Sequence, residues 1–405
     1  MRRVVITGMG LRSPLGSTPE QLFEGLIQGR TGVRSLPDWA RVEELQCLVG
    51  APVSDFDDKQ LPRKYRRTMG RVAMYAVASA RDAVAQAGLS ADELREGNVG
   101  VVAGSTTGSN HADEAFWRHF IETSSVRGIK STLFFQVMSH TVATNLAMFF
   151  GVTGEATSTN AACASSTQAI GLGLDRIRAG RADVIIAGGA DELHVAASMT
   201  FDAMGGASRG FNDSPSLTPR PFDRGRDGIV VAEGAGILVL EEREHARARG
   251  ATILAEVLGY GGTSDAVNMA SPAPEGMKAA IRLSLRDAGI PSEEIGWACA
   301  HATGTPIGDA AEAEALYGIF GDRVPVSSLK GHLGHMLGGC GVVEAIAGVL
   351  AMQKGVLPPT RNLVDPDVAP LLLPTQPLAR PTSRILSTNF AFGGVNTALV
   401  LGAPE

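Results

Sequence analysis

The chain has 405 residues and a formal net charge of -6, and 44% of its residues are hydrophobic while 19% are charged. This balance is typical of a folded globular protein and excludes a disordered chain, and the acidic net charge argues against a generic nucleic-acid-binding protein. The four cysteines are too scattered for a disulfide framework, and no apolar run reaches 18 residues. We therefore expect a soluble, cytoplasmic protein with no membrane span and no nucleic-acid partner.

Short runs rich in valine and isoleucine alternate along the chain with segments of helical periodicity. The predicted strands are 3–7, 99–104, 183–187, 236–240, 252–257, 324–328, 384–388 and 397–401. One helix is predicted to begin at 18–21, where a threonine, a proline and a glutamine have capping-box spacing. Further helices are predicted over 67–87, 164–179, 276–288, 309–319 and 341–354. This alternation predicts an α/β protein with largely parallel sheets.

The two halves of the sequence show a weak similarity. One half contains the strands DVIIA and GILVL, and the other contains RILST and TALVL. A charged stretch at 241–249 precedes Gly250, so the sequence predicts an N-terminal half over 1–250 and a C-terminal half over 251–405. No low-complexity linker separates the halves, and we expect them to pack as one body.

Three motif matches are interpreted as coincidental. Segment 8–10 follows a strand, but the third glycine of a dinucleotide fingerprint is replaced by Ser13, so a plain glycine turn is predicted. Segment 206–210 matches the G-x-S-x-G of serine hydrolases without a strand before it, and a loop is predicted. Segment 332–340 holds two histidines and a cysteine at no common zinc spacing, so no metal site is predicted.

Cys163 follows a segment of small residues and precedes a helix with regular apolar spacing. The N-terminus of a helix favours a thiolate, and small neighbours leave the sulfur approachable. A buried structural cysteine is the alternative interpretation, and this segment alone does not decide between them.

Other reactive side chains follow predicted strands. His301 follows the short apolar segment 297–300, interpreted as a strand end, and precedes the small and hydroxyl residues of 302–305, while Lys330 and His335 follow the predicted strand 324–328. Segment 389–394 ends a third strand with two phenylalanines and a glycine pair. Because ligands bind at the carboxyl ends of strands in α/β sheets, these groups together with the cysteine indicate an active site.

These segments, with PRPFDRGRDG at 219–228, resemble the β-ketoacyl-[acyl-carrier-protein] synthases, the elongating condensing enzymes of the thiolase superfamily. The resemblance runs over nearly the whole chain, from VVITGMG to FAFGGVNTALVLG. It implies the thiolase fold, an α/β fold with duplicated halves in five layers, α-β-α-β-α. It also implies an acyltransferase that condenses a cysteine-bound acyl group with malonyl-[acyl-carrier-protein] by decarboxylation, giving a 3-oxoacyl-carrier, CO₂ and free carrier.

The resemblance implies roles for individual residues. Cys163 matches the nucleophile, His301 and His335 match the two catalytic histidines, and Lys330 matches the active-site lysine. Phe392 matches a gating residue whose backbone N–H forms an oxyanion hole with that of the cysteine. No cofactor is expected beyond the phosphopantetheine that arrives on the carrier protein.

Further residues match supporting positions of the same family. Glu312 matches a carboxylate that pairs near the lysine, and Asp309 is expected to support the site with it. Thr303 and Thr305 match the hydroxyls that hold the pantetheine arm. His332 matches no catalytic position and is interpreted as a residue behind the site or on the surface. The expected docking residues for the acidic carrier protein are Arg63, Lys64, Arg67, Arg127 and Lys130.

Several positions depart from the usual family sequence without removing a catalytic side chain. They are Ile229, Ala302, Gly304, Leu333 and Ala391. These departures favour a specialised fatty-acid-like, polyketide or polyene pathway over housekeeping synthesis.

We expect a homodimer or a heterodimer with a ketosynthase-like subunit. The main alternative is a non-catalytic or weakly active partner subunit like a chain-length factor, which Cys163 argues against. A thiolase is disfavoured because the segment 393–394 carries no second catalytic cysteine.

Overall fold

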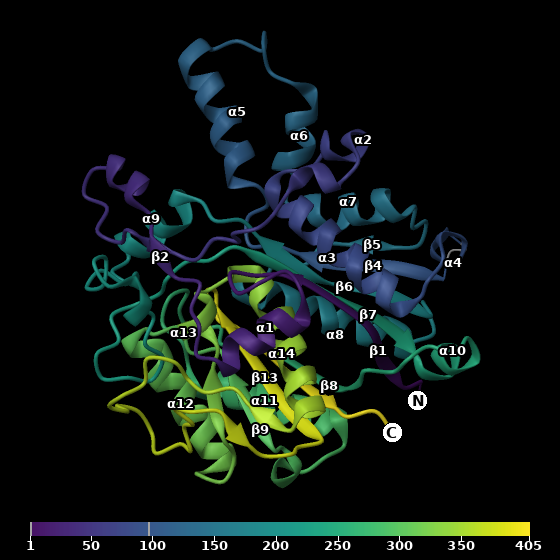
Figure 1. The fold of residues 1–405 in the computed structure, drawn as a ribbon, viewed down its shortest axis with the longest axis vertical. Coiled ribbons are helices and arrows are strands. Elements are labelled where there is room, and N and C mark those ends of the chain that lie inside the picture. Colours follow the sequence, from purple (N-terminus) through teal and green to yellow (C-terminus); the bar gives the residue numbers. More distant parts are fainter. Residues whose placement is uncertain (1, 96–97) are drawn as a thin grey trace.

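The computed structural model describes residues 2–95 and 98–405, and its centre is a ten-stranded sheet (Figure 1). The strands lie side by side in the order β10-β9-β13-β14-β8-β1-β7-β6-β4-β5. Their bounds are β1 (Val4–Arg12), β4 (Val99–Gly104), β5 (Ala156–Thr157), β6 (Val184–Asp191), β7 (Gly234–Glu242), β8 (Ala255–Ser264), β9 (Trp297–Ala300), β10 (Val326–Ser328), β13 (Arg384–Ala391) and β14 (Val395–Gly402). Two separate small sheets pair β2 (Arg34–Ser35) with β3 (Val49–Gly50) and β11 (Val356–Leu357) with β12 (Leu378–Ala379).

The order of the strands is the same in each half of the sheet. Counted outward from the central β1–β8 pair, the N-terminal side runs β1, β7, β6, β4, β5 and the C-terminal side runs β8, β14, β13, β9, β10. In both series the order along the chain is first, fifth, fourth, second, third. The predicted duplication is therefore confirmed in the topology of the sheet.

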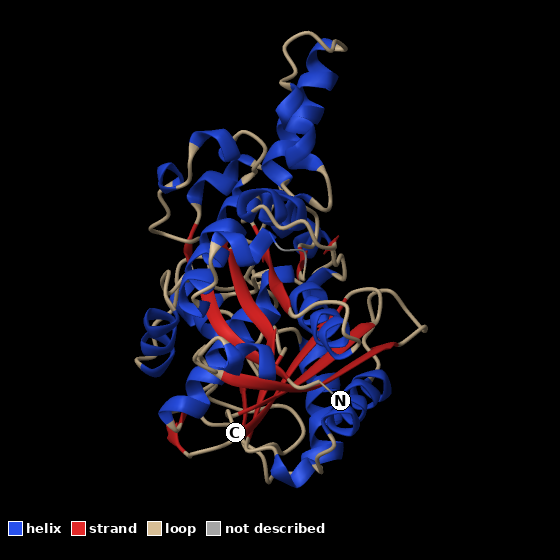
Figure 2. Ribbon diagram, turned by 90° about the vertical axis from the view of Figure 1, so that its right-hand side faces the viewer, coloured by secondary structure: helices blue, strands red, loops and turns tan. Residues whose placement is uncertain are grey.

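Helices form three layers around the two halves of the sheet (Figure 2). The outer layers are α3 (Arg71–Ala87), which contacts β1 and β7, and α11 (Pro274–Ala288) with α12 (Pro306–Phe320), of which α11 contacts β8 and β14. Between the halves, α8 (Ser165–Arg178) contacts β6 on one side and β14 on the other, and α14 (Cys340–Lys354) contacts β7 and β13. This is the expected α-β-α-β-α arrangement.

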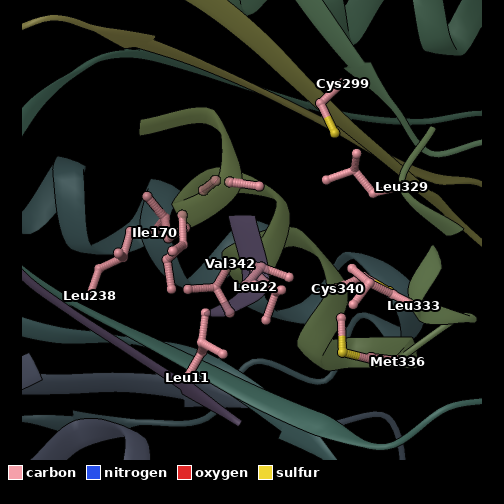
Figure 3. Packing of buried hydrophobic residues seen from close by; sticks show 14 of the residues in the cluster. Leu11, Leu22, Ile170, Leu238, Cys299, Leu329, Leu333, Met336, Cys340 and Val342 are labelled. Atoms are coloured by element: carbon pink, nitrogen blue, oxygen red, sulfur yellow. The ribbon is translucent and has the colours of Figure 1, made fainter. Parts of the chain in front are cut away.

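The middle layer is held by a hydrophobic core drawn from both halves. Ile170 of α8 and Val342 of α14 lie in one cluster with Leu11 and Leu238 of the N-terminal strands and with Ile385 of β13. Figure 3 shows several of these side chains converging between the ribbons. Burying such side chains contributes about 1.5–3 kcal/mol each. Because both halves contribute side chains to this one cluster, they pack as one body, as expected.

The remaining helices lie mostly in the N-terminal half. They are α1 (Pro19–Ile27), α2 (Arg63–Arg66), α4 (Ala91–Arg95), α5 (Asn110–Thr123), α6 (Ser131–Val137), α7 (Thr141–Phe150), α9 (Val195–Ala203), α10 (Arg243–Ala248) and α13 (Lys330–Leu333). Short 3-10 turns are η1 (Pro37–Arg41), η2 (Asp58–Gln60), η3 (Ala162–Ala164), η4 (Pro215–Leu217), η5 (Ser292–Glu294) and η6 (Leu337–Gly339). The predicted cap of α1 is confirmed, because the Thr18 side chain accepts a hydrogen bond from the backbone N–H of Gln21. Helix α5 projects from the body in both views (Figures 1 and 2).

The prediction of largely parallel sheets is wrong. Strand β4 is parallel to β5 and β6, and β9 is parallel to β10 and β13. The pairs around the centre are antiparallel: β1 with β7 and β8, β6 with β7, β13 with β14, and β14 with β8. Apolar runs report burial on both faces of a strand, and here helices cover both faces of antiparallel strands as well.

The glycines of segment 8–10 do not form a turn, because they lie inside β1. A Cβ atom at Gly8 or Gly10 would lie 2.0 Å from the backbone oxygen of Ala83 or Ser79 in α3. These glycines therefore allow close approach of a helix to a strand. The predicted loop at 206–210 is confirmed, since these residues follow α9 without regular structure.

Within the described ranges, one helical stretch, Leu337–Lys354, is long and apolar enough to cross a membrane, but 83% of that window is buried inside the protein. The pair α6 and α7 passes the same test only when joined, and it is bent by 112°. The long stretch is the central core helix described above.

Candidate active site

A cavity of about 340 Å³ lies where the halves meet, and most of the predicted reactive side chains line it, whereas Lys330 does not. Its lining includes Cys163, His301, His335 and Phe392. The reactive atoms of the cysteine and the two histidines lie within 4.8 Å of one another. The structure therefore brings together groups that are up to 172 residues apart in sequence.

Cys163 lies in the 3-10 turn η3, immediately before α8. Ala162 has a φ of 46°, in the left-handed region that non-glycine residues rarely adopt. The Ser165 hydroxyl stabilises this turn by accepting from the Ala161 N–H at 3.0 Å and donating to the Ala162 carbonyl at 2.7 Å. The prediction of a cysteine at a helix start is confirmed, and its sulfur faces the cavity although the residue is only 5% exposed.

His335 is the nearest reactive group to the cysteine. Its Nε2 lies 3.0 Å from the Cys163 Sγ, and its Nδ1 lies 3.1 Å from the Cys340 Sγ. The backbone of His335 is fixed on both sides, because its N–H donates to Val230 and its carbonyl accepts from Ala232. The ring is therefore held between two sulfur atoms.

His301 follows β9 and faces the same space. Its ring centroid lies 5.2 Å from that of His335, with the planes at 80°. Its Nδ1 is buried without a hydrogen-bond partner among the described residues. A buried ring nitrogen of this kind is suited to a group that arrives with a substrate.

The two histidines that line the cavity both favour the neutral form. Burial, followed by the positive charge of Lys330, lowers the pKa of His301 and of His335 well below the ordinary value. Neutral imidazoles can donate one N–H without carrying a readily lost second proton.

Burial favours the thiol form of Cys163 over the thiolate. Burial raises its pKa to about 12, and the charge of Lys330 offsets only part of that rise. Desolvation therefore outweighs the thiolate preference expected from the start of α8.

Lys330 is fully buried and forms an ion pair with Glu344 of α14, and each side chain is 1% exposed. Although burial opposes the ammonium charge, the neighbouring groups raise the pKa of Lys330 above its ordinary value. The second carboxylate oxygen of Glu344 accepts from the Asn389 amide at 2.7 Å, and Thr167 of α8 donates to Asn389. This network links α8, α13, α14 and β13 behind the two histidines.

The lysine's carboxylate is Glu344, so the expected pairing with Glu312 is corrected. Glu312 instead accepts the backbone N–H groups of His301 at 2.8 Å and Ala302 at 2.6 Å, and the Thr388 hydroxyl at 2.7 Å. Burial raises the pKa of Glu312 to about 7. Its contacts show that it holds the His301 loop in place.

Asp309 supports the loop that follows His301. One of its carboxylate oxygens accepts from the backbone of Thr303 at 2.9 Å, and the other accepts from Phe222 at 2.9 Å. Burial raises the pKa of Asp309 to about 6. The Thr303 and Thr305 hydroxyls lie 3.3 Å apart at the cavity wall.

Phe392 lies in the turn between β13 and β14 and is 43% exposed. Its ring stacks on that of Phe201 with centroids 5.8 Å apart. Both rings line the cavity. This position, half open to solvent, is suited to a gate.

His332 is buried and does not line the cavity, so it is not a surface residue. Its ring nitrogens face the carbonyl oxygens of Arg30 at 2.9 Å and Pro359 at 3.2 Å. The side chain therefore ties α13 to two neighbouring segments.

The expected docking residues are exposed in two neighbouring parts of the N-terminal half (Figure 1). Arg63 and Lys64 lie on α2 with Arg67 just after it, and the side-chain amide of Gln136 on α6 donates to the Arg67 carbonyl at 3.2 Å. The other two, Arg127 and Lys130, lie in the segment between α5 and α6. The two basic groups thus lie on adjoining elements.

Sequence reasoning missed Glu344 and Asp191. Glu344 is the single charged residue in the apolar stretch 340–353, and a buried charge needs a partner. Asp191, at the end of β6, accepts from the backbone N–H of Gly338 at 2.7 Å and of Thr106 at 3.0 Å. Its burial raises its pKa to about 7, and nothing in its sequence context marks it.

Comparisons with known proteins find relatives over nearly the whole chain. Family models match over most of the chain: Beta-ketoacyl synthase, N-terminal domain, at residues 1–246 and Beta-ketoacyl synthase, C-terminal domain, at residues 254–364. The 3-oxoacyl-[acyl-carrier-protein] synthase 1 of Haemophilus influenzae is 35% identical, covering 99% of this chain and 98% of the relative.

Solved structures give the same result. A beta-ketoacyl synthase from Burkholderia phymatum is 43% identical with a TM-score of 0.97, and the match covers 100% of both chains. The ishigamide ketosynthase/chain length factor is 36% identical with a TM-score of 0.91, again over 100% of both chains. The expected thiolase fold is thereby confirmed.

Proposed function

The chain belongs to the β-ketoacyl synthase family, and from this premise we propose that it condenses a cysteine-bound acyl group with malonyl-[acyl-carrier-protein]. The products are a 3-oxoacyl-carrier and CO₂. The observation that carries the proposal is the approach of Cys163 Sγ to within 3.0 Å of His335 Nε2 in a cavity that also contains His301.

The first half-reaction transfers the acyl group to the enzyme. The Cys163 sulfur forms a bond to the thioester carbon, the bond from that carbon to the carrier's sulfur breaks, and the thiol proton ends on the released carrier thiol. The backbone N–H groups of Cys163 and Phe392 are assigned to the developing oxyanion. Removing one such donor in comparable sites costs about 3–4 kcal/mol.

The second half-reaction forms the carbon–carbon bond. Loss of CO₂ leaves the electron pair of the broken bond on the malonyl-derived carbon, which becomes an enolate. The enolate oxygen accepts hydrogen bonds from the N–H groups of His301 and His335. The carbon then forms a bond to the acyl carbonyl carbon, the bond from that carbon to the Cys163 sulfur breaks, and the released sulfur takes a proton from solvent. Neutral histidines suit this step because a cationic ring would protonate the carbanion.

Lys330 acts through its charge. It is buried beside the histidines and keeps its proton, so it lowers their pKa. The Glu344 pair keeps that cation in place. The lysine thereby maintains the neutral, N–H-donating state of both rings.

The carrier and its phosphopantetheine arm are the proposed partners at the entrance. Thr303 and Thr305 present hydroxyls at the cavity wall, and Phe392 lies where it can open or close the entrance. The exposed basic residues of α2 and of the α5–α6 segment supply a positive surface for an acidic carrier. No further cofactor is part of this proposal.

Three of the departures from the usual family sequence change the wall of the cavity. Ile229, Ala302 and Ala391 all line it. Because the cavity wall sets which acyl groups fit, we assign the chain to a specialised cytoplasmic pathway of fatty-acid-like or polyketide type.

A second subunit is also part of the proposal. Strand β5 forms one edge of the sheet, and α5 carries the exposed apolar side chains of Trp117, Phe120 and Ile121. Unpaired edges and exposed apolar faces are usually covered in the working assembly. A related structure is described as a ketosynthase/chain length factor, so the partner is a second copy or a related subunit. A non-catalytic role for this chain is disfavoured by the Cys163–His335 contact.

The direct test supplies acyl-carriers of several chain lengths with malonyl-carrier and reads the products by mass spectrometry. We expect a 3-oxoacyl-carrier two carbons longer than the acyl group supplied, for a limited range of lengths. Release of CO₂ from malonyl-carrier with no condensed product at any length would contradict the proposed function.

A further inference from the structure

Cys340 lies on the far side of His335 from the nucleophile. Its Sγ is 3.1 Å from Nδ1 of the ring, while the Cys163 Sγ is 3.0 Å from Nε2. Cys340 is the first residue of α14, and only the turn η6 and Met336 separate it from the histidine. It is 0% exposed, does not line the cavity and belongs to the apolar core shown in Figure 3.

The chemistry of a neutral imidazole limits what these two sulfurs can do. Such a ring has one N–H donor and one acceptor nitrogen, so it can accept from one thiol only. If a thiol donates to Nδ1, the ring proton must lie on Nε2. If a thiol donates to Nε2, the ring proton must lie on Nδ1. The tautomer of His335 is therefore set by which cysteine donates.

The surroundings of the two cysteines distinguish them. Cys163 faces the cavity and exchanges its proton during acyl transfer, whereas Cys340 is sealed in the core. Burial raises the pKa of Cys340 well above its ordinary value, and the charge of Lys330 does not offset this. Cys340 therefore keeps its S–H and has the Nδ1 of His335 within reach.

We propose that Cys340 is a positioning residue whose S–H donates to Nδ1 of His335 and holds the ring in the tautomer with Nε2–H directed at Cys163. This inference rests on the proposed function for its catalytic meaning, because Nε2–H is the donor needed first by the sulfur and then by the enolate oxygen. The contact between Cys340 and His335 involves no substrate, so the inference does not depend on which acyl group the enzyme accepts.

The tautomer is measurable directly. Nitrogen chemical shifts of ¹⁵N-histidine-labelled protein distinguish a protonated from an unprotonated ring nitrogen, and the His335 signals are those lost in His335→Gln. We expect Nε2 protonated and Nδ1 unprotonated in the unsubstituted chain. A His335 ring with its proton on Nδ1 would overturn the proposal without any variant being made.

Two substitutions then separate hydrogen bonding from packing. Cys340→Ala removes the donor, while Cys340→Ser keeps an O–H at the same place. We expect Cys340→Ala to lower kcat roughly three- to tenfold with KM nearly unchanged, as loss of one hydrogen bond implies. It should also mix the two tautomers in the nitrogen spectrum, whereas Cys340→Ser retains the tautomer and most of the turnover. Equal losses in both variants with an unchanged tautomer would show a packing role and defeat the inference.

The pH dependence of Cys163 alkylation gives a second readout that needs no turnover. The charged and titratable groups around the ring, Cys340 and Cys163 include Lys330, Glu344, Cys299, Asp191 and His301. All of these are the same in the two variants, so a shift of the profile between Cys340→Ala and Cys340→Ser reports the donor alone. We expect Cys340→Ala to move the profile to higher pH, and identical profiles would contradict the proposal.

Cys47→Ala is the matched control. Cys47 is also a buried cysteine, its Sγ lies 3.7 Å from the Val49 carbonyl, and it does not line the cavity. It should change neither the tautomer nor the profile. If the unsubstituted chain showed no condensation at all, the proposed function would fail while the nitrogen shifts would still judge this inference.

Discussion

At the scale of single residues, the site depends on burial more than on the helix start that first marked Cys163. The sulfur lies beside a buried cation and a neutral histidine, yet desolvation keeps it protonated. The nucleophile is thus formed when the thiol proton leaves during acyl transfer, and a free, reactive thiolate does not accumulate in the empty site.

This predicts an unusual pH dependence for alkylation of Cys163. Because burial raises its pKa to about 12, the thiolate fraction should keep rising with pH far beyond 8.5, where an ordinary thiol begins to level off. Iodoacetamide rates, with the modified peptide identified by mass spectrometry, measure this. A plateau of the Cys163 rate below pH 8 would mean that the helix start and Lys330 outweigh burial.

The three neighbouring histidines are predicted to differ in function. His301→Ala and His335→Ala should abolish condensation, because both rings face the cavity as N–H donors. His332→Ala should mainly lower the melting temperature, since its ring nitrogens hydrogen-bond to two backbone carbonyls and the residue does not line the cavity. Steady-state kinetics and thermal unfolding measure the two effects. If folded His332→Ala lost as much activity as His335→Ala, this division would be wrong.

At the scale of elements, the ion pair between Lys330 and Glu344 joins α13 to the core helix α14. Removing one partner of a buried pair costs about 3–5 kcal/mol, because the other charge stays buried and uncompensated. We therefore expect Glu344→Ala to lower the midpoint of urea unfolding strongly. Lys330→Met with Glu344→Leu should recover most of that stability but not condensation. A Glu344→Ala protein as stable as the unsubstituted chain would contradict the role assigned to this pair.

The proposed role of the basic α2 residues in carrier docking is tested by reversing their charge. Lys64→Glu with Arg67→Glu should raise KM for carrier-bound substrates and weaken its salt dependence. Turnover of a short pantetheine thioester should stay nearly unchanged, because that substrate needs no docking. Arg282→Glu with Arg286→Glu, the same charge change on α11, is the control. Equal losses on both substrates would indicate a folding role for the α2 residues.

At the scale of the whole molecule, the sequence predicted the parts better than their arrangement. Apolar runs located most of the large-sheet strands, the start of a predicted helix marked Cys163, and strand ends marked His301, Lys330 and His335. Strand direction was not predictable, because a run buried on both faces looks the same in parallel and antiparallel pairs. The partner of Lys330 was missed because Glu344 meets it only through tertiary packing. The boundary at residue 250 stays a prediction.

The formation of an acyl-enzyme at Cys163 is the central claim, and intact-mass spectrometry tests it most directly. Incubation with an acyl-carrier alone should add one acyl group to the chain, and peptide mapping should place it on Cys163. Cys163→Ala should show no adduct, while Cys47→Ala, which alters a buried cysteine outside the cavity, should show the full adduct. An acyl group that persists on Cys163→Ala would contradict the account.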